Sequence, residues 1–158
     1  MNLCANANVN VVLTPVKTDL FSEEMVQLVQ PSRAADDFEG TGRPGHFAGV
    51  VTVVDRLFSV VRPTHAYFGI KDYQQVAVIS DMSAQLHPNI EMVICETERE
   101  HDGLAMSSRN TYLNPAERQA SLVLSKSLDA DEAAYKAGER NAETLCERMR
   151  EIINAEPL

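Results

Sequence analysis

The chain of 158 residues contains 44% hydrophobic and 23% charged residues, and its formal net charge is −9. This composition is typical of a globular protein and excludes a generally disordered chain. The acidic balance argues against a nucleic-acid-binding surface, which needs a basic stripe. An anionic small molecule stays open as a ligand, because it responds to the local field of a cleft.

No apolar run approaches the ~20 residues that span a bilayer, and the first residues lack the basic region of a secretory signal. We therefore expect a cytoplasmic protein with no membrane partner. Three cysteines, Cys4, Cys95 and Cys146, are odd in number and widely separated, so they fit neither a disulfide framework nor a zinc site. We expect buried, reduced thiols. The scattered histidines show no metal-binding spacing, and no metal ligand is predicted.

The first half of the chain predicts one clear helix between weaker elements. The β-branched run Val9–Pro15 predicts a buried strand, and residues 18–45 predict a loop with short helical or strand pieces. A helix follows that ends before Pro63, because one apolar stripe recurs at helical spacing. Its members are Phe47, Val50, Val51, Val54, Leu57, Phe58 and Val61.

Two further strands and three helices are predicted downstream. Residues 65–69 and 90–97 are expected to form strands on either side of a helix that begins at Asp72, with Val76, Ile79 and Leu86 facing inward. Asn114 as N-cap, followed by Pro115, predicts a helix that runs toward Gly138. Residues 141–155 predict a final helix with an apolar side formed by Leu145, Met149, Ile152 and Ile153.

The alternation of strands and helices predicts an α/β fold with a parallel sheet, followed by a helical section. Three strands are fewer than the five or more of a doubly wound sheet, so the sheet is expected to be incomplete. Both ends of the chain look cut.

Functional side chains follow the predicted strand at residues 65–69. Gly69 allows close backbone approach, Lys71 offers a point charge, and Gln75 places an amide one turn further on. Asp72 is able to bind ribose hydroxyls or to cap the helix, whose N-terminal end favours an anion. A capped helix with a surface lysine explains this segment equally well by itself.

A second polar segment, Glu100 to Asn114, follows the strand at residues 90–97 and contains Ser107, Ser108 and Arg109. Hydroxyl groups and a guanidinium suit phosphate oxygens, which Arg binds bidentately. A solvated loop before a helix N-cap is the alternative. Ligands of open α/β sheets lie beyond the carboxyl ends of the strands, so two such segments after adjacent strands favour a phosphate site.

A third unusual stretch, GTGRPGHFAG at residues 40–49, places His46 near the start of the long helix. A hydrogen bond that fixes the loop is the preferred interpretation of this histidine, over a group that titrates near neutral pH. Gly-x-Ser-x-Gly, Walker-type and Gly-x-Gly-x-x-Gly motifs do not occur, which argues against nucleophilic hydrolysis and dinucleotide redox chemistry.

The stretches GRPGHFAGV, FGIKDYQQ and REHDGLAMSSRNTYL, in this order, closely resemble the pantoate–β-alanine ligase (pantothenate synthetase) family. The resemblance runs from about Val9 to the chain end. It implies the C-terminal part of a Rossmann-like nucleotide-binding domain at residues 1–110 and the start of a small, helical C-terminal domain at residues 111–158. It also implies ATP, pantoate and β-alanine as substrates, Mg²⁺ with the ATP, and a homodimer in the full-length family.

The implied reaction forms pantoyl adenylate and pyrophosphate, and then pantothenate and AMP, in the biosynthesis of coenzyme A. Lys71 and Arg109 are the implied catalytic residues, and Gln75 resembles the pantoate-binding glutamine. Residues 106–109 look like the family's counterpart of the KMSKS loop. The full set of implied ATP contacts is Gly69, Ile70, Lys71, Asp72, Glu98, Met106, Ser107, Ser108 and Arg109.

The sequence also departs from the family pattern. Members usually have Glu at the position of Ile70 and a small apolar residue at that of Glu98, whose backbone would face the adenine. The family's His-x-Gly-His motif and its second pantoate-binding glutamine are not in this sequence. We therefore expect this chain to hold part of a site and to form no pantothenate alone.

Two hypotheses stay open. The chain is a portion of a ligase, or it is a non-catalytic remnant or half-protein that needs a complementing N-terminal segment. A different nucleotidyl transferase is disfavoured, because Gln75 and GRPGHF resemble the pantoate-specific family.

Overall fold

A computed structural model describes residues 2–21 and 28–158, which fall into two compact units that meet in sequence between Cys95 and Glu96. The domain boundary expected after residue 110 lies inside the second unit and stays a prediction. No helix in the described part of the chain is long and apolar enough to cross a membrane.

The first unit is built on two parallel strands, β1 (His65–Gly69) and β2 (Glu91–Cys95). Helix α5 (Tyr73–Leu86) connects them and confirms the predicted strand–helix–strand order. The register runs from His65 opposite Glu91 to Gly69 opposite Cys95. Because the strands are parallel, their carboxyl ends lie side by side at one edge of the sheet.

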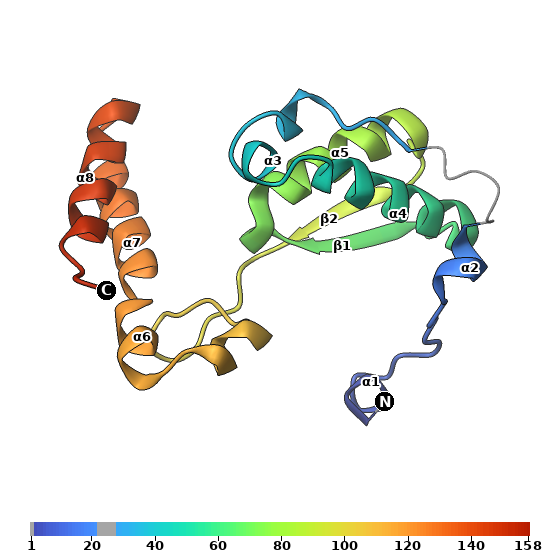
Figure 1. Cartoon of the computed structure of the whole chain (residues 1–158), viewed down its shortest axis with the longest axis horizontal. Coiled ribbons are helices and arrows are strands. Elements are labelled where there is room, and N and C mark those ends of the chain that lie inside the picture. The colour runs from blue at the N-terminus through green and yellow to red at the C-terminus, as the bar shows by residue number, and fades with distance from the viewer. Residues whose placement is uncertain (1, 22–27) are drawn as a thin grey trace. The chain divides into compact units, whose positions relative to one another are not determined.

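Helix α4 (His46–Val61) and helix α5 lie on the same side of the two strands (Figure 1). The predicted helical stripe is confirmed for most of its length, because its larger residues enter the core. Val61 and Leu86, both expected to face inward, are exposed, since each is the last residue of its helix, where the packed face ends. The buried core comprises Phe47, Val51, Phe58, Ala66, Val78, Ile79 and Met82.

The opposite face of the sheet carries exposed side chains in the described residues. Tyr67, which alternates with the buried Ala66 along β1, is 68% exposed. Strands β1 and β2 pair only with each other among the residues described. A two-stranded sheet is a small scaffold, and its stability usually needs a third strand or packing against a helix. Helices α4 and α5 supply that packing on the covered face.

The predicted third strand is wrong. Val9 to Pro15 have no strand structure, and the apolar side chains from Val9 to Leu13 are exposed. A β-branched run becomes a strand only when another strand satisfies its backbone groups, and no described segment pairs with it.

The polar segment that follows has the short helical pieces that were predicted. They are α2 (Lys17–Leu20), the 3₁₀ turn η1 (Arg33–Ala35) and α3 (Glu39–Gly42), while a separate short helix, α1 (Asn2–Asn6), begins the chain. Residues 22–27 of the predicted loop lie outside the described residues.

The second unit contains the 3₁₀ turn η3 (Ser108–Tyr112) and helices α6 (Pro115–Ala120), α7 (Val123–Lys136) and α8 (Ala142–Asn154). The predicted cap of α6 is confirmed. The Asn114 side chain accepts hydrogen bonds from the amides of Ala116 and Glu117 at 2.9 and 3.0 Å, and Glu117 accepts from the Asn114 amide at 2.8 Å.

The single helix predicted from Asn114 toward Gly138 is divided into α6 and α7. At the division the Ser121 hydroxyl donates to the Arg118 carbonyl at 2.7 Å, and the Leu122 amide donates to the Gln119 carbonyl at 3.3 Å. This three-residue spacing tightens the last turn of α6, and a serine hydroxyl that binds a carbonyl one turn back competes with the helical backbone bond.

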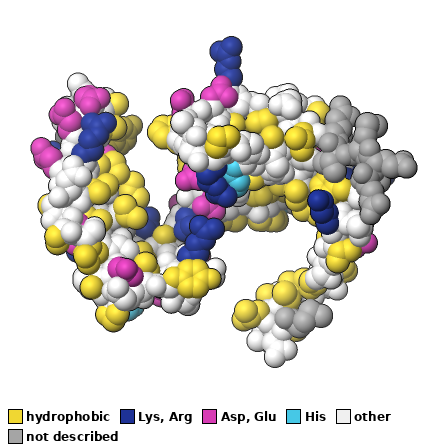
Figure 2. Space-filling model, viewed as in Figure 1, with side chains coloured by type: hydrophobic (Ala, Val, Ile, Leu, Met, Phe, Trp, Pro, Cys, Tyr) yellow, Lys and Arg dark blue, Asp and Glu magenta, His cyan; other side chains and the backbone are white. Residues whose placement is uncertain are grey.

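Helices α7 and α8 lie side by side as a hairpin (Figure 1), and the helix predicted at residues 141–155 is confirmed. Gly138, at φ +111°, follows the end of α7, and Asn141 caps α8. Charged side chains gather at one end of this hairpin in Figure 2. Exposed ion pairs such as Arg150–Glu143 occur on its surface. Such pairs contribute little to stability.

The prediction of buried thiols is wrong, because none of the three cysteines is fully buried. Cys95 and Cys146 are exposed, and Cys4 is half-buried; all three are free. Cys95 is the last residue of β2, and Cys146 lies on the solvent side of α8, so neither is enclosed by a packed element.

Candidate functional site

The segment after β1 leaves open space next to its backbone. Gly69 has ordinary extended dihedral angles, and a Cβ added there would meet no atom within 4 Å. The chain then forms the 3₁₀ turn η2 (Ile70–Asp72), which leads directly into α5. The structure therefore leaves room for a ligand to approach Gly69 at the carboxyl edge of the sheet.

Lys71 and Asp72 present opposite charges on this turn. The Lys71 Nζ lies 3.7 Å from the Asp72 Oδ1, and both side chains are largely exposed. Asp72 occupies the N-cap position of α5, but its carboxylate makes no capping hydrogen bond, so the predicted cap is not formed. The carboxylate is therefore free of the helix and able to accept hydrogen bonds from a ligand's hydroxyl groups.

Gln74 has a role that the sequence did not indicate. Its Nε2 donates to the carbonyls of Ala34 at 2.8 Å and Asp37 at 2.7 Å, and its Oε1 accepts from the Glu39 amide at 3.1 Å. One amide thus connects the start of α5 to the loop before α3. Gln75, the next residue, is half-buried, and its side chain makes no hydrogen bond within the described residues.

Replacing Gln74 by alanine is expected to lower the free energy of unfolding by about 1–3 kcal/mol, because three backbone groups lose a partner. Gln85→Ala, on the exposed side of the same helix, is the matched control and should change it by less than about 0.5 kcal/mol. Urea unfolding of the two variants and the parent chain measures the difference. Equal effects would show that the three hydrogen bonds contribute nothing.

The polar segment after β2 begins with a short hairpin. The Met106 amide donates to the Glu98 carbonyl at 2.8 Å, the Glu100 amide donates to the Leu104 carbonyl at 2.7 Å, and Arg99 pairs with Ala105 in an antiparallel bridge. Glu98 and Met106, both implied ATP contacts, are therefore adjacent across the hairpin. The Glu98 carbonyl already accepts a backbone hydrogen bond.

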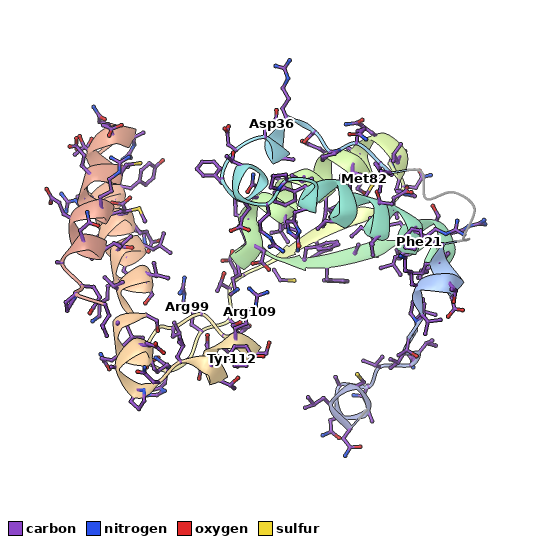
Figure 3. All side chains as sticks on the ribbon, viewed as in Figure 1. Phe21, Asp36, Met82, Arg99, Arg109 and Tyr112 are labelled. Atoms are coloured by element: carbon purple, nitrogen blue, oxygen red, sulfur yellow. The ribbon has the colours of Figure 1, made fainter. Side chains whose placement is uncertain are left out.

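The hairpin leads into Ser107, Ser108 and Arg109. The Ser107 hydroxyl caps η3 by accepting from the Arg109 amide at 3.2 Å, and Asn110 Nδ2 donates to the Ala105 carbonyl at 3.1 Å. The side chains of Ser108 and Arg109 are exposed and make no hydrogen bond or ion pair within the described residues. Figure 3 shows Arg99 and Arg109 extending outward from this segment. The guanidinium of Arg109 is therefore available for an anion.

Asp102 and Arg118 form the least exposed of the carboxylate–arginine ion pairs in the described residues. The Arg118 Nη2 lies 3.0 Å from Oδ1 and 2.9 Å from Oδ2 of Asp102. The hydrogen bond from Arg118 holds the pKa of the Asp102 carboxyl below its ordinary value, and the same bond raises the pKa of the Arg118 guanidinium. Both groups are therefore charged at neutral pH.

Two other expectations have different outcomes. His46 is the first residue of α4, and its ring lies beside that of Phe47, with 5.0 Å between the ring centroids. The loop-fixing hydrogen bond expected of its side chain is not found among the described residues.

Lys71 and Arg109 belong to the first and the second unit, respectively, so their convergence on one ligand stays a prediction.

Comparison with known proteins identifies the family. The sequence model of one family, described as pantoate-beta-alanine ligase, matches residues 1–158. The chain belongs to the pantoate–β-alanine ligase family.

Individual members of this ligase family agree with the match. A pantothenate synthetase of Pelobacter propionicus is 48% identical over 158 residues, which are the whole of this chain and 56% of the relative. One of Roseiflexus castenholzii is 46% identical over 150 residues, which are 95% of this chain and 54% of the relative. The chain thus spans about half the length of the curated relatives it matches.

Solved structures of ligase family members show the same fold. The crystal structure of pantothenate synthetase from Thermus thermophilus has a TM-score of 0.91 and 40% identity, over 99% of this chain and 56% of that one. A pantoate-beta-alanine ligase from Francisella tularensis, complexed with beta-gamma ATP and β-alanine, has a TM-score of 0.74 and 28% identity, over 96% of this chain and 56% of that one. The predicted α/β, Rossmann-like fold is therefore confirmed.

Proposed function

We propose that the protein that contains this chain condenses pantoate with β-alanine at the expense of ATP, through a pantoyl adenylate. Family membership supports the ligase reaction. The observation in the structure that carries the proposal is the register of the sheet, in which Gly69 lies opposite Cys95. The two segments with ligand-type side chains therefore leave the sheet at one edge, where α/β proteins bind their ligands.

The first segment is proposed to bind the nucleotide and pantoate. The open space beside Gly69 leaves room for ATP, and the Lys71 ammonium binds the phosphates of that ATP. The uncapped Asp72 carboxylate accepts hydrogen bonds from the ribose, since ionised carboxylates are acceptors only. Gln75, one turn into α5, offers amide groups to pantoate. Ile70 contributes a backbone contact here, because its apolar side chain has no group for a phosphate.

The second segment is proposed to bind the triphosphate. Met106 to Arg109 follow the hairpin, with the Glu98 backbone beside the adenine and the Ser108 hydroxyl and Arg109 guanidinium on phosphate oxygens. A guanidinium fork binds two phosphate oxygens at once, and a fixed positive charge near the leaving pyrophosphate stabilises the charge that develops there. Mg²⁺ is proposed to enter with ATP, because it binds mainly through phosphate oxygens and keeps several waters.

The proposed chemistry has two balanced steps. A carboxylate oxygen of pantoate attacks the α-phosphorus, and the bond from that phosphorus to the bridging oxygen breaks, so that pyrophosphate leaves with the electron pair. The amine of β-alanine then attacks the acyl carbon and loses a proton, and AMP leaves. The residues named above position the reactants and compensate charge, which are the two main contributions of a protein to phosphoryl-type transfer.

A second candidate is a half-protein that needs a complementing segment for activity. The chain spans 56% of the Pelobacter propionicus relative, and the face of the sheet that carries Tyr67 is exposed in the described residues. An apolar ring on an uncovered sheet face is typical of a surface that another element covers. The expected absence of pantothenate formation by the isolated chain belongs to this candidate.

An activity assay tests both candidates. The 158-residue chain is compared with a chimera in which residues 1–158 replace the matching region of the Pelobacter propionicus relative, and AMP release is measured with ATP, pantoate and β-alanine. We expect release by the chimera and none by the isolated chain. Release by the isolated chain would overturn the half-protein candidate, and a folded but inactive chimera would overturn the ligase proposal for these residues.

A further inference from the structure

The proposed phosphate-binding loop of the second unit lies between the hairpin and helix α6. The hairpin ends at Met106, η3 follows, and the capping box at Asn114 starts α6. Asp102 at the hairpin tip and Arg118 in α6 are 16 residues apart in sequence, and their ion pair joins the two ends of this segment. Ser107, Ser108 and Arg109 thus lie inside a loop that a pair of charges closes.

We propose that Asp102 and Arg118 are positioning residues, whose ion pair closes this loop and holds Ser107 to Arg109 in the arrangement that binds the triphosphate. The inference rests on the proposed function, because it assigns a role to residues that support the Arg109 side chain and do not touch the substrate themselves. Closing a flexible loop removes conformations that its inner residues would otherwise sample. A phosphate contact that is held in place before binding costs less entropy when the ligand arrives.

The pair is better placed for this role than the other ion pairs of the second unit. The side chains of Asp102 and Arg118 are 29% and 28% exposed, whereas those of Glu143 and Arg150 are 68% and 62% exposed. One Arg118 nitrogen contacts both carboxylate oxygens. Asp102 Oδ1 also accepts from the Leu104 amide at 3.4 Å. The ion pair is therefore less exposed than the Arg150–Glu143 pair, and it is attached to the backbone that it holds.

Two further features show that the hairpin tip is partly buried and lies close to α7. Leu104 is only 7% exposed, so the tip is anchored by apolar burial as well as by charge. Gly103 has a φ of +96°, and a Cβ added there would lie 3.2 Å from the Ser125 hydroxyl oxygen of α7. The positive φ favours glycine here, and a side chain at residue 103 would require the Ser125 hydroxyl to shift by a few tenths of an ångström.

The first test measures the loop directly in the 158-residue chain. Hydrogen exchange of the Met106 and Asn110 amides, which donate to Glu98 and Ser107, reports the order of the loop. We expect exchange about three- to tenfold faster in Asp102→Asn and in Arg118→Gln, and no further increase in the double variant, because the two side chains act as one pair. Glu143→Gln, which breaks a pair of the same kind on α8, is the matched control and should leave these amides unchanged.

Unchanged exchange in Asp102→Asn would overturn the proposal, whether or not the chain proves to be part of a ligase.

The second test uses the chimera and measures KM for ATP and for β-alanine separately. Asp102→Asn is expected to raise the KM for ATP about tenfold and to leave that for β-alanine unchanged, with partial recovery in Asp102→Glu. Faster exchange with an unchanged KM for ATP would also overturn the positioning role. An inactive parent chimera would count against the proposed function alone, because the exchange test does not depend on turnover.

Discussion

Replacing Arg109 by alanine is expected to lower the kcat/KM of the chimera for ATP by about 10²- to 10³-fold, the size of effect seen when one preorganised charge-stabilising donor is lost. The physical reason is the position of this side chain. Its guanidinium is exposed and free of ion pairs in the described part of the chain, while the backbone beneath it is held by the Ser107 hydroxyl. It is therefore the group of this loop that is able to meet developing phosphate charge.

Three comparisons make the Arg109 result specific. Arg109→Lys should recover part of the loss, because it restores the charge without the bidentate fork. Glu98→Ala should change kcat/KM far less, since only the backbone of that residue is proposed to face the adenine. Arg148→Ala, which removes an exposed arginine of α8, should have no effect. Equal losses for Arg109→Ala and Glu98→Ala in steady-state assays would contradict the phosphate role.

Replacing Ile79 by alanine is expected to lower the free energy of unfolding of the first unit by about 2–5 kcal/mol. Ile79 is completely buried in α5 and belongs to the core that α4 and the sheet share. Its loss removes apolar burial and leaves a cavity that rigid neighbours fill only in part. A small domain has a total stability of about 5–15 kcal/mol, so this one change removes a large share of it.

The control for Ile79 lies on the same helix. Leu86, the last residue of α5, is 51% exposed, so Leu86→Ala should cost about 0.5 kcal/mol or less. Denaturant unfolding followed by the methyl NMR signals of Val51 and Val78 reports the stability of this core. If Leu86→Ala and Ile79→Ala shifted the midpoint equally, the core assigned to α4, α5 and β1 would be wrong.

The residues proposed to bind ligands share a structural arrangement. Gln75 follows Gln74, which donates to and accepts from three backbone groups of the preceding loop, and Arg109 precedes Asn110, which donates to the hairpin. In both places a side chain that is free for a ligand adjoins one that holds the backbone. Sites need this division, because a contact that is displaced by about an ångström loses much of its effect.

Several features of the fold and site were predictable from the sequence because they depend on local patterns. Helical spacing from Phe47 to Val61 predicted α4, and Asn114 with Pro115 predicted the start of α6, which the structure confirms. The alternation of strands and helices predicted the parallel pairing of β1 and β2. The three quoted motifs were sufficient to identify the ligase family.

Other features depended on which helices and strands pack or pair with one another. Local sequence patterns carry no information about these tertiary contacts. An apolar run such as Val9 to Leu13 has the composition of a strand, but no described segment pairs with it. The thiols of Cys95 and Cys146 are exposed because no packed element covers them.

The amino-acid sequence by itself therefore determined the family, the main helices and strands, and the chemical types in the proposed site. Only the tertiary structure decided which side chains hold that site in place. Gln74 and the Asp102–Arg118 pair contact residues 16 to 40 positions away along the chain. Such contacts follow from the folded path of the backbone, because the spacing of residues within a single element specifies only which face of that element is apolar.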